Sequence, residues 1–340
     1  MNFGAAEREM EAHMIKKLSA LAFAVASMSL LTGEAQAQKV WKHGMVEAKS
    51  DAGFVFMAEK GGFAEKNGIK LESMQFKGDA IALKALIAGE IDSYEGSPGA
   101  PMVAFSKGAD VRLVGCYWPG LTYAIFTKAD VKSVAELKGK TFGISSPGAL
   151  PDLFARAVLE KNNVDGKDVQ YAQMGSDTDR FRAVMAGVIQ AAASSSEFTP
   201  ITDKMGLKVL VHAHDVTPDY VRFCTYMSAK TISSRPDDAA KFLAASIQAY
   251  RFALKNRAAV VKLTREMTSA KDDDPRAEYV FDEVVKLNAI DTEMGIDRKK
   301  LTWMKDLFTK TETLTSPVDL DKFIDGSVRD KAIAIAGPKG

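Results

Sequence analysis

Between Val40 and about Tyr226, short apolar runs alternate with stretches of helical period, and Gly, Asp, Ser and Pro separate them. Ten runs have the length and composition of β-strands, at 40–46, 69–76, 91–94, 111–118, 123–128, 141–145, 169–174, 188–193, 207–212 and 222–228. Four stretches between them have the apolar spacing of helices, at 53–65, 80–88, 150–161 and 177–186. This alternation predicts βαβ units and mainly parallel sheets.

After residue 228 the pattern changes to long helical stretches without a convincing strand, at 237–256, 257–268, 275–287 and 298–308. The first of these carries an apolar stripe that includes Phe242, Ile247, Tyr250 and Leu254. A helix with such a stripe must bury it against another element. We expect these helices to cover the α/β region that precedes them.

An internal repeat indicates that the α/β region consists of two similar lobes. Residues 85–98 (ALIAGEIDSYEGSP) and 183–196 (AVMAGVIQAAASSS) align without a gap at a separation of 98 residues. Each copy predicts a helix, a glycine just after it and a buried strand that ends in small polar residues. Asp79 and Asp177, which have the same separation, are the predicted N-caps. Chance similarity between two Ala-rich helix–Gly–strand units is the alternative, and two like lobes is the interpretation we favour.

The first 37 residues have the three-part pattern of a secretory signal peptide. Lys16 and Lys17 precede an apolar run at 18–31, and Ala35 and Ala37 form an A-x-A cleavage motif. The run is too short to span a bilayer, so a retained anchor is the alternative that we do not favour. Translation starts at Met1 or at Met14, because the stretch before Met14 is acidic for a signal. We expect a soluble, exported protein.

Length and charge restrict the organisation and the class of partner. We predict that residues 38–122 begin lobe I, that 123–224 form lobe II, and that 225–340 complete lobe I and supply the C-terminal helices. The formal net charge of the chain is +1, which argues against nucleic acid or a membrane surface as a partner. Cys116 and Cys224 are the two cysteines, each in a β-like run. They either pair or stay as small buried hydrophobic residues, and we favour the unpaired state.

The candidate site lies where the strands end, because facing α/β lobes bring strand carboxyl ends and helix N-termini into one crevice. The segment Ser145–Ser146–Pro147–Gly148 is one such end, with two hydroxyls and predicted free backbone N–H groups at a helix start. Several other strands end in similar small polar residues. The predicted ligand-binding residues are Ser50, Asp51, Phe54, Gly78, Asp79, Ser97, Pro98, Trp118, Tyr123, Ser145, Ser146, Gly148, Ser195, Ser196 and Glu197.

The chain shows no pattern that assembles a nucleophile with its base, so no catalytic residue and no enzyme activity are predicted. It contains no G-x-S-x-G, H-E-x-x-H, P-loop or G-x-G-x-x-G motif. His212, His214 and Asp215 are close in sequence, but a metal site needs a third ligand from elsewhere, which the sequence does not specify. We therefore expect a loop histidine pair, no metal and no cofactor.

Four segments resemble the periplasmic solute-binding proteins of ABC importers for sulfonates, taurine and nitrate, together with thiamine-precursor binders. They are GGFAEKNGIKLE (61–72), ALIAGEID (85–92), SVAELKGKTFGIS (133–145) and AVMAGVIQAA (183–192). The resemblance implies the type II periplasmic binding protein fold, with two doubly wound, mainly parallel lobes. It also implies a hinge of two crossing segments, near 121–128 and 221–228, and C-terminal helices on lobe I.

The resemblance also implies the function. We expect capture of a small organic anion, a sulfonate or an aliphatic or aromatic carboxylate, between the lobes of a monomer. Hinge closure then allows delivery to an inner-membrane ABC permease. A thiamine-precursor pyrimidine or other heterocycle is the second candidate, and an enzyme on the same fold is the third. Sulfonate-type members carry Trp-Asp-Pro after the second repeat, whereas this chain has Ser195–Ser196–Glu197–Phe198, which leaves the ligand open. The cysteine-rich motif of the pyrimidine-synthesising branch is absent.

Overall fold

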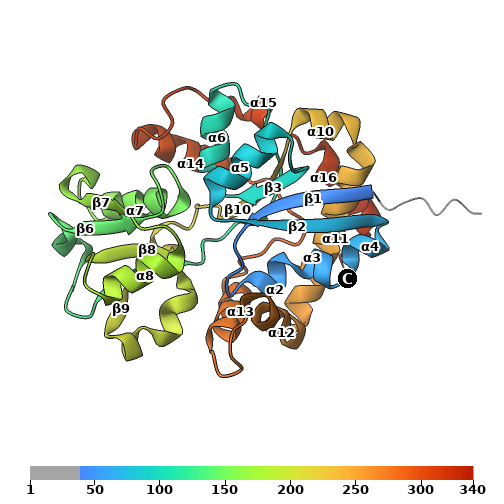
Figure 1. Ribbon diagram of the computed structural model, residues 1–340. Coiled ribbons are helices and arrows are strands. Elements are labelled where there is room, and N and C mark those ends of the chain that lie inside the picture. Colours follow the sequence, from blue (N-terminus) through green and yellow to red (C-terminus); the bar gives the residue numbers. More distant parts are fainter. Residues whose placement is uncertain (1–38, 340) are drawn as a thin grey trace, which may run out of the picture. The chain divides into compact units, whose positions relative to one another are not determined.

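The computed structural model describes residues 39–339, which belong to one compact unit (Figure 1). The predicted signal peptide and its cleavage motif lie outside the described residues. Within the described range, no helix combines the length and the hydropathy needed to cross a bilayer.

The first sheet has five strands in the order β2-β1-β3-β10-β4. They are β1 (Lys39–Val46), β2 (Ile69–Phe76), β3 (Ser93–Gly96), β4 (Arg112–Trp118) and β10 (Phe223–Met227). β1 runs parallel to both β2 and β3, whereas β10 is antiparallel to β3 and to β4. The sheet is therefore parallel except for one inserted strand, which comes from much later in the sequence.

The second sheet has the same pattern, in the order β7-β6-β8-β5-β9. Its strands are β5 (Tyr123–Lys128), β6 (Thr141–Ile144), β7 (Gln170–Gln173), β8 (Ala191–Ser195) and β9 (Leu207–His212). β6 is parallel to β7 and β8, and β5 is antiparallel to β8 and β9. Figure 1 shows β6 to β9 in green to yellow, apart from the blue and teal strands of the first sheet. Two mostly parallel sheets confirm the predicted fold class.

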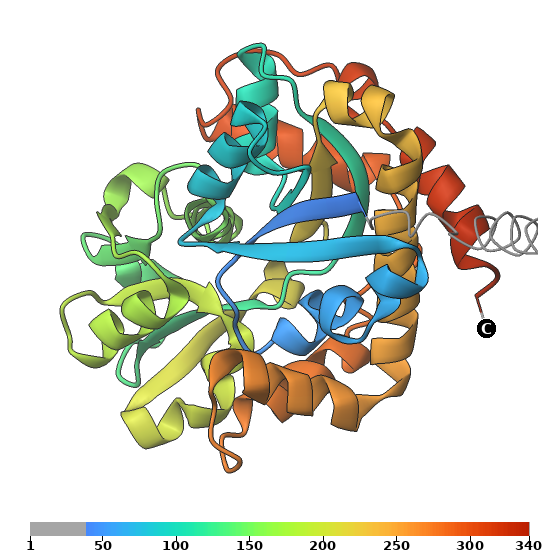
Figure 2. The same cartoon turned by 45° about the vertical axis from the view of Figure 1, so that its right-hand side comes forward.

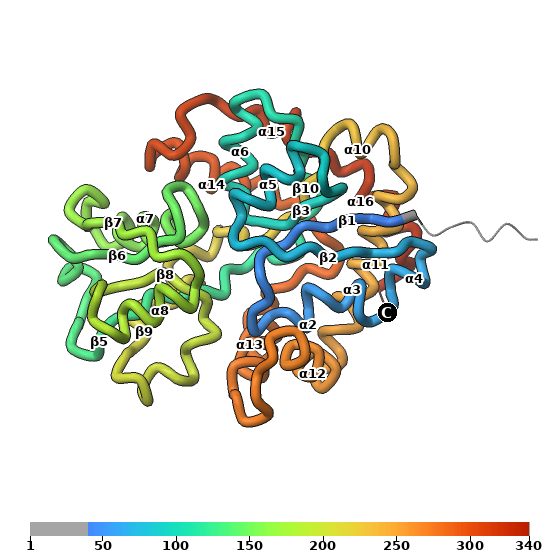
Figure 3. Tube along the Cα trace, in the orientation of Figure 1, coloured from blue at the N-terminus to red at the C-terminus, as the bar shows by residue number. Residues whose placement is uncertain are grey.

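The chain passes between the sheets twice (Figure 3). Residues 119–122 lead from β4 to β5, and residues 213–222 lead from β9 to β10. Each crossing delivers the antiparallel strand of the sheet that it enters. The crossings predicted at 121–128 and 221–228 are placed too late, because residues 123–128 and 223–227 are paired strands.

The internal repeat is present in three dimensions. Helices α5 (Asp79–Ala88) and α8 (Asp177–Met185) begin 98 residues apart, and β3 and β8 follow them with the same offset. Gly89 and Gly187 both have φ of 75°, a left-handed conformation that glycine adopts without strain. The two copies also occupy equivalent places in their sheets, which supports common ancestry over chance similarity.

Two details of the predicted repeat are wrong. Strands β3 and β8 begin later than predicted, because the residues after each glycine form turns before pairing starts. The N-caps are Gly78 and Ser176, so Asp79 and Asp177 are the first helical residues. Ser176 forms a capping box with Asp179, which leaves the Asp177 carboxylate available for other partners.

The helix predicted at 53–65 is three short helices, α2 (Ala52–Val55), α3 (Met57–Lys60) and α4 (Phe63–Lys66). The break before α4 falls at Gly62, whose φ of 74° is left-handed. The remaining elements of the α/β region are α6 (Gly99–Ser106), α7 (Leu150–Lys161), α9 (Ala213–Val216) and the 3₁₀ helices η1 (Val134–Leu137), η2 (Gly166–Asp168), η3 (Ser196–Ile201) and η4 (Asp203–Met205).

The C-terminal helices cover the first sheet, as predicted. They are α10 (Ala229–Ser234), α11 (Pro236–Lys255), α12 (Arg257–Thr268), α13 (Arg276–Lys286), α14 (Arg298–Lys310), α15 (Leu320–Phe323) and α16 (Ser327–Ala336). In Figure 2 the long golden helix α11 runs beside the blue strands β1 and β2, with which it is in contact. Its Leu243 and Ile247 share a core with Trp41 of β1 and Val114 of β4.

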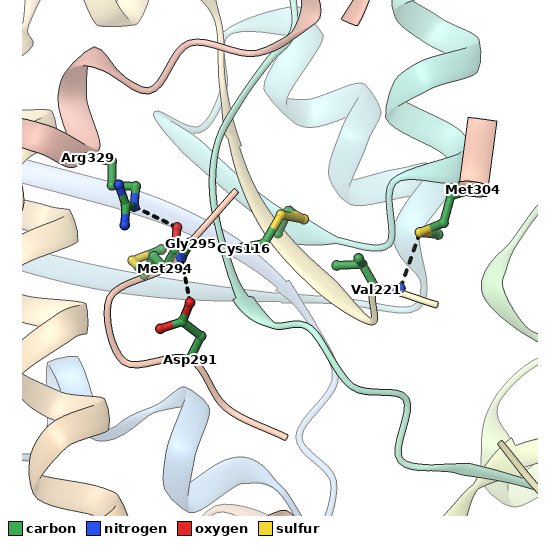
Figure 4. Close-up of a disulfide and its surroundings, with 8 residues drawn as sticks. Cys116, Val221, Asp291, Met294, Gly295, Met304 and Arg329 are labelled. Atoms are coloured by element: carbon green, nitrogen blue, oxygen red, sulfur yellow. Dashed lines mark hydrogen bonds between the residues drawn. A yellow bond between two sulfur atoms is a disulfide. The ribbon is translucent and has the colours of Figure 1, made fainter. Parts of the chain in front are cut away.

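Cys116 of β4 and Cys224 of β10 form a disulfide (Figure 4). The expectation that they stay unpaired is therefore wrong. β4 and β10 are neighbours in the first sheet although 108 residues separate the cysteines, and the local pattern of each strand contains no sign of that pairing. Figure 4 also shows Val221 N–H donating to Met304 Sδ of α14 at 3.2 Å, which ties the end of the second crossing to a C-terminal helix.

Candidate functional site

The loops at the carboxyl ends of the two sheets are in direct contact. The β1–α2 loop of the first sheet meets the residues that follow β8 of the second sheet. Ser50 N–H donates to Glu197 Oε2 at 2.9 Å, and both residues are buried. Ser196 Oγ donates to Glu283 Oε2 of α13 at 2.5 Å. Three predicted site residues therefore lie at one junction between the sheets.

Lys49 and Asp177 form an ion pair across the same junction. Asp177, at the start of α8, also pairs with Arg180 and accepts from Tyr123 OH at 2.8 Å and Ser195 N–H at 3.1 Å. Burial alone would raise the pKa of Asp177, but the charges of Lys49 and Arg180 outweigh it and hold that pKa below its usual range. Burial by itself would lower the pKa of Lys49, but the attractions of Asp177, Tyr123 and Asp51 together outweigh it and raise that pKa.

Arg222 joins both crossings to the β1–α2 loop. Its guanidinium pairs with Asp51 and donates to Thr122 Oγ1 of the first crossing at 2.8 Å. The guanidinium carbon lies 4.4 Å from the ring centroid of Trp118 and 4.5 Å from that of Phe223. Because Asp51 binds Arg222, its side chain does not cap α2. This cluster lies where the two sheets are connected.

Two further carboxyl groups at the junction have neutral hydrogen-bond donors. Asp79 Oδ1 accepts from Tyr94 OH at 2.9 Å, and burial raises the pKa of Asp79. Burial likewise raises the pKa of Glu197, despite its hydrogen bond from Ser50. Gly96 permits the first contact, since a Cβ there would lie 1.8 Å from Tyr94 OH. Neither carboxylate has an ion-pair partner within the described range.

Ser97 and Pro98 precede α6 and are buried. The Ser97 hydroxyl lies 3.5 Å from Tyr220 OH of the second crossing. The charge of Asp79 also acts on Tyr220, whose pKa is raised chiefly by burial. These contacts place the end of β3 against the second crossing, beside the junction.

The 145–148 segment differs from its prediction. Helix α7 begins at Leu150, so Pro147 lies outside it, and Pro151 is the proline of the first turn. Gly148 N–H donates to Asp152 Oδ2 at 2.8 Å and is therefore not free. The hydroxyls of Ser145 and Ser146 make no hydrogen bond to the rest of the described chain. The segment still lies against α6 of the first sheet. Gly99, the first residue of α6, is so close that a Cβ built on it would lie 3.1 Å from the Gly148 carbonyl oxygen.

Two predicted aromatic residues belong to the core. Phe54 is fully buried, stacks on Phe281 at 5.6 Å and meets Trp118 edge-on at 5.9 Å. Trp118 lies under Arg222, and its Nε1 is buried without a hydrogen-bond partner among the described residues. Gly78 faces open space, because no atom lies within 4 Å of a Cβ built on it. Trp118 contributes its ring face to Arg222, whereas Phe54 and Gly78 take no part in the polar contacts of the junction.

Sequence reasoning missed Lys49 and Glu283 and gave Asp177 and Arg222 no binding role. A buried arginine or aspartate needs a partner, and Arg222 stands in the apolar run VRFC, which is a usable signal. Glu283 lies in an ordinary amphipathic helix, so nothing in its local sequence distinguishes it.

Two pockets differ in their relation to this junction. One of about 10 Å³ lies beside Lys49, Asp51 and Glu95, and has room for about one water molecule. Another of about 370 Å³ lies between α7, residues 216–219 of the second crossing and α14, and Trp303 and Lys161 are among its lining residues. The first pocket therefore lies at the junction, because Lys49 and Asp51 are junction residues, whereas the second lies away from it.

Residues 49–259, more than half of the chain, match the family model described as NMT1/THI5 like. The chain belongs to this family. A comparison with curated protein sequences finds no match.

Solved structures show the same fold at low identity. The alkanesulfonate-binding protein SsuA of Xanthomonas axonopodis pv. citri, bound to MOPS, is 17% identical with a TM-score of 0.71, covering 86% of this chain and 99% of that one. The nitrate-binding protein NrtA of Synechocystis PCC 6803 is 16% identical with a TM-score of 0.73, covering 89% and 90%. The desulfurization enzyme DSZB is 16% identical with a TM-score of 0.64, covering 87% and 99%. These likenesses identify the fold as that of periplasmic binding proteins.

Proposed function

We propose that the protein is an exported, periplasmic solute-binding protein that captures a small polar solute between its two sheets and passes it to an ABC permease. The sheets with their helices act as two lobes, 123–222 and the remainder, with the second boundary at 222 because β10 starts at Phe223. The observation that carries the proposal is the buried polar junction, where Lys49–Asp177, Ser50–Glu197 and Ser196–Glu283 link the lobes. Family membership and the fold support it.

The charges at the junction favour a solute that donates hydrogen bonds, such as an aminopyrimidine or a related nitrogen heterocycle. Lys49 and Arg180 share Asp177 as their ion-pair partner, and Arg222 is paired with Asp51. Asp79 and Glu197 have only neutral donors, so they can accept from N–H groups of a ligand. Together with Asp51 and Asp177, they give the junction four carboxyl groups for three cations, so an entering anion would meet an excess of carboxyl groups.

The organic anion ranked first by sequence reasoning is the second candidate. Lys49 favours it, because the ammonium group could exchange Asp177 for a sulfonate or carboxylate when the lobes separate. The structures that bind alkanesulfonate and nitrate support this class as well. A transformation of the solute is the third candidate, and the likeness to a desulfurization enzyme is its support.

Calorimetric titration of residues 38–340 tests the proposal, with aminopyrimidines, alkanesulfonates, aromatic carboxylates and nitrate as probes. We expect an aminopyrimidine to bind and Glu197→Gln to weaken binding at least about tenfold, because the amide replaces an acceptor by a donor. Lys161→Gln, at an exposed lysine in the pocket beside α7, is the control and keeps full affinity.

Other results distinguish the alternatives. Sulfonate binding that Lys49→Gln abolishes would assign the anion class. Binding that Lys161→Gln reduces and Glu197→Gln leaves intact would move the site to the pocket beside α7 and contradict the proposal. Mass spectrometry of the recovered solute should show no change of mass, and conversion would indicate an enzyme.

A further inference from the structure

A histidine pair and a glutamate from different lobes meet at the start of the second crossing. His212 is the last residue of β9 and His214 lies in α9, whereas Glu283 is in α13, which shares its core with the first sheet. The ligand-capable atoms of all three residues lie within 4.8 Å of one another. The structure thus supplies the third ligand that the sequence did not specify for the histidine pair.

The surroundings orient these side chains. The two imidazole rings stack with centroids 5.2 Å apart, and His212 Nδ1 is buried without a hydrogen-bond partner in the described chain. Ser196 Oγ donates to Glu283 Oε2 at 2.5 Å, and Tyr279 OH lies 3.4 Å from Oε1. Such hydrogen bonds to a carboxylate are typical of the groups that support metal ligands.

Two histidines and one carboxylate are a donor set that suits Zn²⁺, with a fourth position open to water. We propose that His212, His214 and Glu283 bind a divalent transition-metal ion of the Zn²⁺ type. Zinc bonds of about 2.0–2.1 Å hold tetrahedral ligand atoms about 3.4 Å apart, so the side chains need to move by roughly 1 Å. His214 is exposed and has the freedom to do so.

The nearby charges are balanced. Lys286 adds a positive charge near His212, and Asp215 lies 3.4 Å from His214 Nε2 and offsets it. A carboxylate beside a ligating imidazole also raises its basicity as a ligand.

The position of the site gives it a consequence for the whole molecule. Ser196, which holds Glu283, is adjacent to Glu197, which holds Ser50. Because the ligands come from both lobes, the complete site exists only when the lobes are together. The metal therefore stabilises the arrangement in which the lobes are together. If a solute binds only to that arrangement, the metal increases the affinity for the solute, and the solute increases the affinity for the metal by the same factor.

Calorimetric titration of untagged, chelator-stripped protein with ZnCl₂ tests the proposal. We expect one ion per chain, and a loss of at least about tenfold in affinity for both His214→Ala and Glu283→Gln, since even indirect supporting groups contribute that much. Glu266→Gln, at an exposed glutamate of α12 paired with Lys262, is the matched control and keeps full affinity. Co²⁺ should give the intense visible bands of tetrahedral coordination, and both ligand variants should lose them.

Specific results would overturn the inference. Absence of stoichiometric Zn²⁺ binding would do so, and so would binding that neither ligand variant changes. Loss in His214→Ala with full affinity in Glu283→Gln would show a histidine pair within one lobe and refute the bridging site. Glu283→Gln preserves the shape of the side chain and circular dichroism checks its fold. Because the probe is the metal alone, a negative result would contradict the metal site only. The proposed solute capture is tested separately by the titrations with candidate solutes.

Discussion

At the scale of single residues, the junction is unusual for its number of buried charges. Arg180 and Arg222 are each about 1% exposed, and Asp51, Asp177 and Glu197 are also buried. Isolated charges in such places are very costly, so each cation needs its partner. The partner of Arg180 is Asp177, three residues away, whereas the partner of Arg222 is Asp51, 171 residues away. The Asp51–Arg222 pair makes the structure depend on a contact that the local sequence does not specify.

The Asp51–Arg222 pair gives a prediction about stability. Asp51→Asn leaves the buried Arg222 charge without compensation, so the free energy of unfolding should fall by about 3–5 kcal/mol. Urea denaturation at neutral pH measures it. The double variant Asp51→Asn, Arg222→Met should recover much of the loss, because the unpaired charge is gone. Additive losses in the double variant would show that the two side chains are not energetically coupled.

At the scale of elements, the inserted strands β5 and β10 explain how two repeats form one protein. In each sheet four strands run parallel to one another, and the strand of the helix–Gly–strand unit is one of them. The remaining strand is antiparallel and arrives by a crossing from the other sheet. The two sheets are therefore tied together by continuous chain, and the disulfide joins the strand that leaves the first sheet to the strand that returns to it.

The disulfide gives a prediction at this scale. Cys116 and Cys224 close a loop of 108 residues, and in the chain-entropy account a loop of that size contributes up to about 4.7 kcal/mol, with about 2–4 kcal/mol typical. The double variant Cys116→Ala, Cys224→Ala should lose stability of this order in urea denaturation. Dithiothreitol should destabilise the wild type similarly and leave the double variant unchanged. Equal stability of reduced and oxidised protein would contradict the expectation.

At the scale of the whole molecule, the lobes meet in both apolar and polar contacts. Leu153 and Phe154 of α7 share an apolar core with Met304 and Phe308 of α14. The polar contacts include the Lys49–Asp177 and Lys310–Glu160 ion pairs and the hydrogen bonds to Glu197 and Glu283. Polar pairs of this type are replaceable by water, so the arrangement of two lobes is suited to opening. A solute that contacts both lobes shifts the population toward the closed form by its differential affinity.

Small-angle scattering tests this expectation. Saturation with the solute found by titration should reduce the radius of gyration, since closure brings the lobes together. Lys49→Gln removes the Lys49–Asp177 pair and should enlarge the radius of the solute-free protein. A radius that stays the same at saturation would count against hinge closure, even if binding is tight.

Much of the fold was predictable because its signals are local. Strands 69–76, 123–128 and 207–212 match β2, β5 and β9 residue for residue. Their runs of β-branched and aromatic residues between turn residues specify strands without reference to the rest of the chain. Strand starts after Gly89 and Gly187 were less certain, because an apolar residue in a turn looks the same as one in a strand.

The candidate site was predictable only in outline. Strand ends could be located, and Ser50, Ser196 and Glu197 do lie together at the junction. Gly148 could not be assigned correctly, because the acceptor of its N–H is the side chain of Asp152 in the first turn of α7. The solute-binding role of these residues stays a prediction.

The sequence by itself determined the approximate position of most strands and of the long helices, that a unit recurs after 98 residues, and where polar strand ends occur. These depend on periodicity over a few residues, which local backbone preferences and burial of one face dictate. The tertiary structure alone decided that Cys116 meets Cys224, that Lys49 meets Asp177, and that Glu283 joins His212 and His214. These contacts join residues that are distant in sequence, and they form only when the sheets and helices pack together. The local hydrophobic pattern around each residue does not specify its partner.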